Sequence, residues 1–230
     1  NGGFMPASSG RVLLIDVAGL SHGFLRDPDA APAIRALARD GGTVAALKPS
    51  FPAVTCSVQA ALTTGAGADR HGIVANGYYD RDRLRESFWE QSDRLVQAER
   101  LWTVARRRNP AFKSAMLFWQ NSIASDNDII LTPAPIHLHS GGMVQSCYAK
   151  PETLYADLVR EIGAFNLMGY WGPFTRAKSS RWIARATVHV IDWFTPHLVL
   201  TYLPHLDYNQ QRWGPSDPRL AKDLAETDRC

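Results

Sequence analysis

The sequence has few cysteines, no long hydrophobic run and almost no excess of charge of either sign. Cys56, Cys147 and Cys230 are an odd number of widely spaced cysteines, which excludes a dense disulfide framework and fits no zinc-finger or Cys-x-x-Cys pattern. No apolar stretch approaches the roughly 18 residues of a membrane-spanning helix. The formal charge of +3 over 230 residues is far below that of a dedicated nucleic-acid binder. We therefore expect a soluble globular protein that binds neither a nucleic-acid polymer nor a membrane.

The N-terminus and the cysteines bear on where the protein works. Residues 1–10 lack the charged and apolar regions of a signal peptide, and we expect a tag remnant or a disordered segment there. Unpaired cysteines are easiest to reconcile with a reducing compartment, so the sequence favours the cytoplasm. A secreted or periplasmic location stays open, because a signal peptide removed before residue 1 would leave no trace.

Apolar runs that alternate with helical patterns predict an α/β fold. Residues 11–18 and 196–203 are short apolar runs of the kind found in fully buried strands. A helix over residues 29–39 followed by a strand at 43–47 would complete a βαβ unit, which implies a parallel sheet with right-handed crossovers. Further elements are expected as a strand at 114–119 and helices at 98–108, 151–162, 179–194 and 217–230.

Two regions interrupt this alternation. Residues 126–150 are rich in Pro, Ser, His and Gly, and we expect them outside the sheet, within a cap or excursion spanning roughly residues 120–175. The last predicted helix has no following strand against which to pack. The α/β pattern therefore looks incomplete on its C-terminal side.

The most informative segment runs from Lys48 to Gly77, where a loop leads into a helix. The first N–H groups of a helix have no partner within it and the helix dipole is positive there, so they can hold phosphate oxygens. Thr55 lies in this first turn, where its hydroxyl would face a bound phosphorus atom. The alternative is a capping hydroxyl without a catalytic role.

The spacing in this segment resembles that of the alkaline phosphatase superfamily. Its members place a Thr, Ser or Cys nucleophile ten residues before a Thr-Gly glycine and sixteen before a His-Gly pair, and counting back from Gly65 and His71 leads to Thr55 both times. Threonine there is typical of the type I phosphodiesterase/nucleotide pyrophosphatase branch, which also places an Asn against a phosphate oxygen at the position of Asn76. The resemblance implies that Asn76 acts in catalysis, and that Asn76 and Cys56 contact the substrate.

A sulfatase-like site is not supported by the same segment. That branch needs Cys or Ser at position 55, followed by Pro and Arg at the positions that Ser57 and Gln59 occupy here. Cys56 is one residue out of register. His71 is expected to be structural and to close a hydrogen bond to its own loop.

The resemblance also implies a site for two divalent ions, commonly zinc, with Thr55 among the ligands. Family members place an Asp directly before the glycine that follows the first strand, where this chain has Ala18. Asp16 lies on the same side of that strand, about 7 Å further back, and is the candidate substitute. The alternative for Asp16 is a buried carboxylate held by loop N–H groups.

The second pair of ligands matches in part. Asp207 occupies the Asp position, whereas Gln211 stands where the family has His. An amide oxygen is a weaker zinc ligand than imidazole. His205 could substitute if the strand before it ran on and placed it on the same face as Asp207; otherwise it is a satisfied His at a strand end. The remaining ligands of the family belong to sequence beyond Cys230.

The resemblance implies an alkaline-phosphatase-like three-layer α/β sandwich with a mostly parallel central sheet, formed by residues 11–230 as one incomplete domain. The implied function is a metal-dependent hydrolase that uses Thr55 to cleave phosphoester or phosphoanhydride bonds of small phosphorylated substrates. Two alternatives remain: a degenerate member that binds a phosphorylated ligand without turnover, and a phosphonate hydrolase. The sequence does not indicate the substrate, the metal or the oligomeric state.

Overall fold

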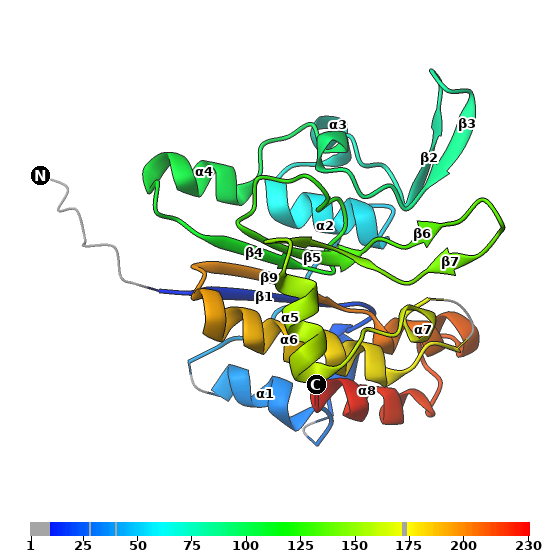
Figure 1. Cartoon of the computed structure of the whole chain (residues 1–230). Coiled ribbons are helices and arrows are strands. Elements are labelled where there is room, and N and C mark those ends of the chain that lie inside the picture. The colour runs from blue at the N-terminus through cyan, green and yellow to red at the C-terminus, as the bar shows by residue number, and fades with distance from the viewer. Residues whose placement is uncertain (1–9, 28, 40, 172–173) are drawn as a thin grey trace, which may run out of the picture.

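A five-stranded sheet forms the centre of the molecule (Figure 1). The computed structural model describes residues 10–27, 29–39, 41–171 and 174–230, so residues 1–9 of the expected tag or disordered segment lie outside the described residues. The strand order across the sheet is β1 (Val12–Val17), β9 (Leu198–Leu203), β4 (Ser114–Leu117), β5 (Ile129–Pro133) and β8 (Cys147–Lys150). All neighbours are parallel except β8, which is antiparallel to β5. The predicted α/β fold with a mostly parallel sheet is confirmed.

Helices cover both faces of the sheet and make the molecule three-layered (Figure 1). One layer contains α2 (Thr55–Thr64), α3 (Ala68–His71) and α4 (Leu101–Arg108). The other contains α1 (Pro32–Arg39), α5 (Leu154–Ile162), α6 (Ala177–Phe194), α7 (His205–Trp213) and α8 (Leu220–Asp228). In this layer α6 packs directly on β9 and β4, and α8 packs against α6, α7 and α1. Among the described residues, no helix is both long and apolar enough to cross a membrane.

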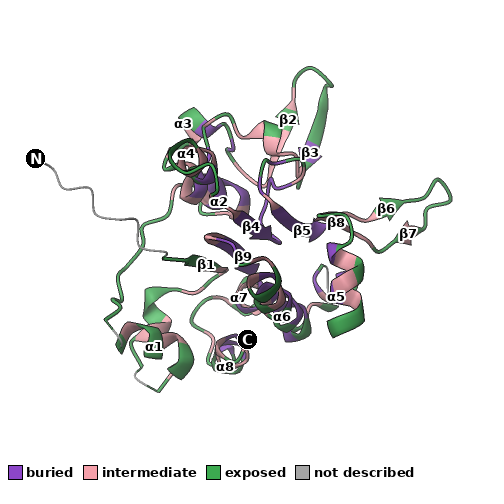
Figure 2. Cartoon of the chain, turned by 60° about the vertical axis from the view of Figure 1, so that its left-hand side comes forward, coloured by how far each residue is buried: buried purple, intermediate pink, exposed green. Residues whose placement is uncertain are grey.

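Shorter elements lie at the margins of the three layers. Two antiparallel hairpins project from the body, one formed by β2 (Gly77–Asp80) and β3 (Arg85–Phe88) and the other by β6 (Ile136–His137) and β7 (Met143–Val144) (Figure 2). Three short 3-10 helices are also present among the described residues, namely η1 (His22–Leu25), η2 (Asp93–Leu95) and η3 (Leu167–Gly169).

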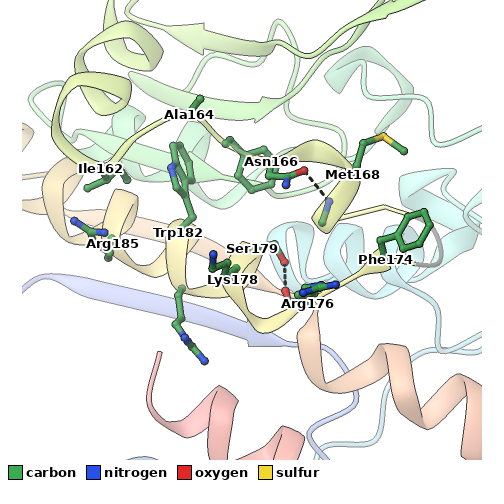
Figure 3. A pocket seen from close by; sticks show the side chains of 13 residues that line it. Ile162, Ala164, Asn166, Met168, Phe174, Arg176, Lys178, Ser179, Trp182 and Arg185 are labelled. Carbon is green, nitrogen blue, oxygen red and sulfur yellow. Dashed lines mark hydrogen bonds between the residues drawn. The ribbon is translucent and has the colours of Figure 1, made fainter.

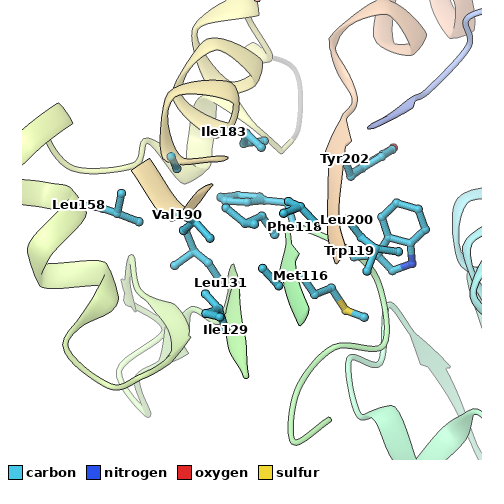
Figure 4. Packing of buried hydrophobic residues seen from close by; sticks show 14 of the residues in the cluster. Met116, Phe118, Trp119, Ile129, Leu131, Leu158, Ile183, Val190, Leu200 and Tyr202 are labelled. Carbon is cyan, nitrogen blue, oxygen red and sulfur yellow. The ribbon is translucent and has the colours of Figure 1, made fainter. Parts of the chain in front are cut away.

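The core lies where β4 and β9 meet α6. Every residue of β4 is buried, and Phe118 and Trp119 directly after it are fully buried. The Phe118 ring packs edge-on against Phe165 and Tyr170, with centroids 4.7 and 5.5 Å away, and this cluster continues into α6 (Figure 4). Such close-packed aromatic contacts fix the segments that follow β4 and β9.

β1 differs from the fully buried strand that its apolar run predicts. It lies at the sheet edge, and among the described strands it pairs only with β9. Val12, Leu13 and Ile15 are accordingly 58%, 46% and 43% exposed. The strand predicted at residues 43–47 is absent: the chain there is exposed and irregular, so the predicted βαβ unit does not form. An apolar run indicates a strand, but it does not identify the neighbours that would cover that strand.

The expectation that residues 126–150 lie outside the sheet is wrong for two parts of the segment, β5 and β8, which are strands of the central sheet. Residues 134–146 between them lie outside that sheet and include the β6–β7 hairpin. The two strands are short and flanked by turn-forming residues, so the composition of the segment as a whole does not indicate them. The other predicted elements are present with slightly different bounds, and the last helix, α8, buries Leu224 in a small cluster with Leu206 and Ala31.

Candidate active site

Thr55 is the first residue of α2, and the loop before it is fixed by the helix itself. The preceding residue, Val54, is extended, with φ −118° and ψ 160°. Ser57 donates its hydroxyl to the Pro52 carbonyl at 2.7 Å, which ties the loop back to the first turn. α2 ends at Gly65, whose φ of +63° favours glycine over any residue with a side chain. The Thr-Gly part of the sequence pattern is therefore the C-terminal end of the helix whose first residue is Thr55.

Asn76 sits beside the same helix terminus. Its side-chain oxygen accepts a hydrogen bond from the backbone N–H of Cys56 at 2.9 Å. The loop that carries Asn76 begins at His71, which is fully buried and accepts the Ile73 N–H on Nδ1 at 3.1 Å. This is the structural hydrogen bond expected for His71, and it fixes the turn that leads to Asn76.

A small pocket of about 220 Å³ lies next to the first turn of α2. Cys56 and Asn76, the two residues expected to contact substrate, both line it, together with Tyr78, Glu90 and Asn121 among others. Burial raises the pKa of the Cys56 thiol to about 12. At neutral pH Cys56 is therefore a thiol and a poor nucleophile.

Tyr202 connects Thr55 with the two carboxylates predicted for the site. It lies in the buried part of β9, is 6% exposed, and the side chain of the neighbouring Thr55 lowers its pKa in part. Tyr202 is also the register partner of Asp16 on β1, so the two side chains project from the same region of the sheet. Burial raises the pKa of Tyr202, and the negative charges of Asp16 and Asp207 raise it further. Thr55, Asp16 and Asp207 therefore share one neighbourhood around Tyr202, a residue that the sequence does not single out.

Asp16 is held by a side-chain amide of α2. Gln59 is fully buried and donates Nε2 to Asp16 Oδ2 at 2.7 Å, while its Oε1 accepts the Gln120 N–H at 2.8 Å. Burial raises the pKa of Asp16, and the hydrogen bond from Gln59 opposes this rise. The sequence offers a buried carboxylate held by loop N–H groups as the alternative to a metal ligand. Asp16 is indeed a partly buried carboxylate, but it is held by Gln59 and not by loop N–H groups. Its second oxygen remains available.

Asp207 and Gln211 lie one turn apart on α7. Gln211 Nε2 donates a hydrogen bond to Asp207 Oδ2, as expected for side chains at i and i+4 on one helix face. Burial raises the pKa of Asp207, and the Gln211 hydrogen bond lowers it in part. The structure therefore makes Gln211 a partner of Asp207, through its amide nitrogen.

His205 does not share a face with Asp207, because the strand does not run on. β9 ends at Leu203 and α7 begins at His205. Two residues along an α-helix are separated by about 200° around its axis, so the two side chains point in nearly opposite directions. His205 instead lies against Asp223 and Glu226 of α8. Burial lowers the pKa of His205, and the two carboxylates raise it in part.

The carboxylates near Thr55 have the chemistry of a cation site. Neither Asp16 nor Asp207 has a cationic partner within the described ranges, and each engages one oxygen with a glutamine amide. Two partly buried carboxylates without a compensating charge among the described residues suit a divalent ion, which prefers such oxygen ligands. They are fewer than the three protein ligands that catalytic zinc sites use, so these residues alone do not form a two-ion site.

A larger hollow of about 750 Å³ lies elsewhere, between the end of α5, η3 and the start of α6 (Figure 3). Trp182 and Phe174 line it together with four cations and no carboxylate, the cations being Arg176, Lys178, Arg181 and Arg185. It contains none of the residues around Thr55, so its size does not make it part of the candidate site.

A family model and a curated protein match most of this chain. The family model described as type I phosphodiesterase/nucleotide pyrophosphatase matches residues 12–230. An uncharacterized pyrophosphatase/phosphodiesterase of Schizosaccharomyces pombe is 24% identical over 215 residues, which are 86% of this chain and 34% of that protein.

Solved structures share the fold. Murine ectonucleotide pyrophosphatase/phosphodiesterase 5 matches 95% of this chain and 50% of its own, with a TM-score of 0.61 and 18% identity. Phosphonoacetate hydrolase from Sinorhizobium meliloti matches 100% of this chain and 54% of its own, with a TM-score of 0.62 and 16% identity. The chain thus spans about a third of the curated relative and about half of each solved structure. It belongs to the type I phosphodiesterase/nucleotide pyrophosphatase family, a family of phosphoester hydrolases within the alkaline phosphatase superfamily.

Proposed function

We propose that this chain carries the nucleophile of a phosphodiesterase- or pyrophosphatase-type hydrolase, and that Thr55 is that nucleophile. The observation that carries the proposal is the position of Thr55 at the start of α2, beside Tyr202 and next to the Cys56 N–H, which donates to Asn76 Oδ1. A helix N-terminus attracts the anionic oxygens of a phosphate group, which brings phosphorus to the Thr55 hydroxyl.

In the proposed reaction, Thr55 Oγ1 attacks phosphorus and passes its proton to water, while the bond from phosphorus to the leaving oxygen breaks. The leaving group then takes up a proton from water. In a second step, a water molecule displaces Thr55 from phosphorus and restores the hydroxyl. Asn76 Oδ1 accepts the Cys56 N–H, and Asn76 Nδ2, which donates to no described residue, would donate to a phosphate oxygen. That donor and the first N–H groups of α2 would stabilise the negative charge that develops on the phosphate.

The family is metal-dependent, and Asp16 and Asp207 are the described residues that would hold a divalent ion, zinc or manganese, near Thr55. Bound there, such an ion lowers the pKa of the nucleophile and neutralises charge on the phosphate. Asp16 would be oriented by Gln59 and Asp207 by Gln211, each through one oxygen. Asn76 and Cys56 would contact the substrate from the small pocket.

The substrate class is a small phosphorylated molecule, as in the family. The murine relative has also been solved as an inactive variant, in which a threonine is replaced by alanine, in complex with AMP. That relative supports both a threonine nucleophile and a nucleotide phosphoester as the substrate to test first.

The test is hydrolysis of bis-p-nitrophenyl phosphate by the full-length protein with zinc or manganese. We expect Thr55→Ala to lower kcat/KM by at least about a thousandfold, since the first bond-forming group is lost. Thr55→Ser should keep measurable activity, because it keeps the hydroxyl. Thr64→Ala, at the other end of the same helix, should keep most of the wild-type rate. Equal rates for wild type and Thr55→Ala would refute the proposal.

A second candidate function is binding of a phosphorylated ligand without turnover. It is favoured by Ala18, which stands at a family ligand position, and by Gln211, which offers its nitrogen to Asp207. In that case the full-length protein would bind AMP with no hydrolysis by wild type in either metal. The fold also resembles phosphonoacetate hydrolase, so release of phosphate from phosphonoacetate, lost in Thr55→Ala, would identify a phosphonate hydrolase.

A further inference from the structure

Three side chains with metal-ligand chemistry converge between α7 and α8, on the side of α7 that faces away from Asp207. His205 Nε2 lies 3.3 Å from Glu226 Oε2 and 3.6 Å from Asp223 Oδ1. One potential ligand atom from each of the three residues lies within 4.8 Å of the others. Asp223 and Glu226 are three residues apart on α8 and therefore project from the same helix face.

His205 is buried, and no described residue satisfies its ring nitrogens with a hydrogen bond of good geometry. Its side chain is 7% exposed, yet neither ring nitrogen makes a well-aligned hydrogen bond. A buried imidazole nitrogen ordinarily has a hydrogen-bond partner or a metal. Here Nε2 points into the space between two carboxylates, which is the geometry of a ligand whose metal would sit among the three atoms.

The orientation of Asp223 fits the same purpose. Its Oδ2 accepts a hydrogen bond from Asn209 Nδ2 at 2.7 Å, which leaves Oδ1 directed at His205. Hydrogen bonds of this kind, from outside the ligand set, fix the direction of metal-binding carboxylates.

The negative charge of the two carboxylates beside His205 also favours a bound cation. Asp223 is 8% exposed and Glu226 is 23% exposed, so two carboxylates share a mostly buried site. Arg181 of α6 acts electrostatically on His205, but it forms no ion pair with either carboxylate in the described part of the chain. A protonated His205 would neutralise only one of the two negative charges. A divalent cation would neutralise both and use the imidazole nitrogen as a neutral ligand.

We propose that His205, Asp223 and Glu226 bind a divalent transition metal ion that joins α7 to α8. One imidazole nitrogen and two carboxylate oxygens form a ligand set suited to zinc, to which water would be the fourth ligand. His205 is the first residue of α7, two residues before Asp207. The ion would therefore also hold in place the start of the helix that carries Asp207. This site does not depend on the proposed function of Thr55.

The test is zinc binding by the full-length protein after removal of metals with a chelator, measured by competition with a chromophoric chelator. We expect Glu226→Gln to weaken binding at this site by more than about tenfold, because a carboxylate ligand is replaced by an amide of the same shape. His205→Gln should weaken it similarly. Asp207→Asn should leave this binding step intact, which separates it from a metal bound near Thr55. Glu161→Gln, an exposed change on α5, is the matched control and should bind as the wild type does.

The shift in Tm on addition of zinc is a second readout, which does not require the zinc affinity to be measured. Zinc should raise the Tm of wild type and of Asp207→Asn, and should raise that of Glu226→Gln much less. If His205→Gln fails to fold, the Glu226→Gln variant, which changes a more exposed side chain, still tests the proposed site. Equal zinc affinity and equal Tm shifts in wild type and Glu226→Gln would overturn the proposal, as would loss of all zinc binding in Asp207→Asn alone.

Discussion

At the scale of single residues, burial and hydrogen bonding act in opposite directions on Asp16. Burial in the protein disfavours the ionised carboxylate, and the Gln59 amide favours it, with burial the larger effect, so the pKa of Asp16 is raised. The folded protein consequently holds the Asp16 proton to higher pH than the unfolded chain does. As the pH rises through this window, the stability contributed by the protonated form is lost, and above it the ionised carboxylate is a net cost.

Asp16→Asn should therefore stabilise the metal-free protein at neutral pH. The asparagine oxygen can still accept the Gln59 hydrogen bond, while the cost of a buried charge disappears. We expect the free energy of unfolding to increase by on the order of 1 kcal/mol at pH 7. The gain should shrink as the pH falls and vanish below about 3.9, where the aspartate is protonated in both states. Urea unfolding across pH, with a chelator present, measures this.

The control for this prediction is the metal. If Asp16 binds a divalent ion, zinc should stabilise the wild type more than Asp16→Asn, and so reduce or reverse the difference between them. A variant that is less stable than the wild type at pH 7 in chelator would contradict the account of Asp16.

The sequence identifies some residues of the site and misses others for a physical reason. Thr55 and Asn76 are found because they lie at fixed distances from Gly65 and His71, and the structure puts them at one helix terminus. Gln59 and Tyr202 are missed because their roles depend on contacts with Asp16 and Thr55, which are distant in the sequence. A buried glutamine in a helix carries no local pattern that names its partner.

At the scale of elements, Arg100 connects several segments in the layer that contains α2, α3 and α4. Its guanidinium is 4% exposed and donates to Asp93 Oδ1 from two nitrogens at 3.0 and 3.2 Å and to the Asn121 carbonyl at 3.1 Å. It also donates to Thr63 Oγ1 near the end of α2. One side chain thus joins α2, η2 and the loop after β4, and each of the three contributes a residue to the small pocket beside Thr55.

Arg100→Ala should destabilise the fold by about 3–5 kcal/mol, because it leaves the Asp93 charge and two further acceptors without their donor. Arg94→Ala, which removes an exposed arginine from the neighbouring η2, should change stability by less than about 0.5 kcal/mol. Chemical denaturation of both variants gives the comparison. Similar small losses in the two proteins would show that the Arg100 contacts contribute little.

Helices and strands are predicted well where the local sequence pattern alone indicates the element. They are predicted poorly where the element forms only if a neighbouring strand or helix packs against it. α6 has a long helical pattern followed by Thr195 and Pro196, and β9 is a continuous apolar run, so both are found from the sequence. The sequence of residues 43–47 is also typical of a strand, yet these residues pair with no described strand and their backbone is irregular. His205 would share a face with Asp207 only if β9 ran on, but His205 begins α7, which directs its side chain toward α8.

At the scale of the whole molecule, β1 leaves one edge of the sheet unpaired among the described residues. Leu13 and Ile15 lie on the same face of this strand, and both are more than 40% exposed. Exposed apolar edge strands can pair with another copy of a chain, and lysine on such an edge opposes that pairing.

Leu13→Lys should therefore raise the concentration at which the 230-residue chain begins to scatter light. Leu37→Lys is the matched control: it changes a leucine that is 72% exposed on α1, away from the sheet edge, and should leave scattering unchanged. Circular dichroism checks that both variants keep the fold. The same scattering onset in wild type and Leu13→Lys would mean that β1 is not the surface through which the chain associates.

The central claim, that Thr55 is the nucleophile, is tested most directly by looking for the bond it would form. Full-length protein is mixed with a phosphodiester substrate, quenched in acid during turnover, digested and analysed by mass spectrometry. The account predicts a covalent phosphoryl adduct on the peptide that contains Thr55, absent in Thr55→Ala. Turnover by the wild type with the adduct on another residue, or undiminished turnover by Thr55→Ala, would contradict it.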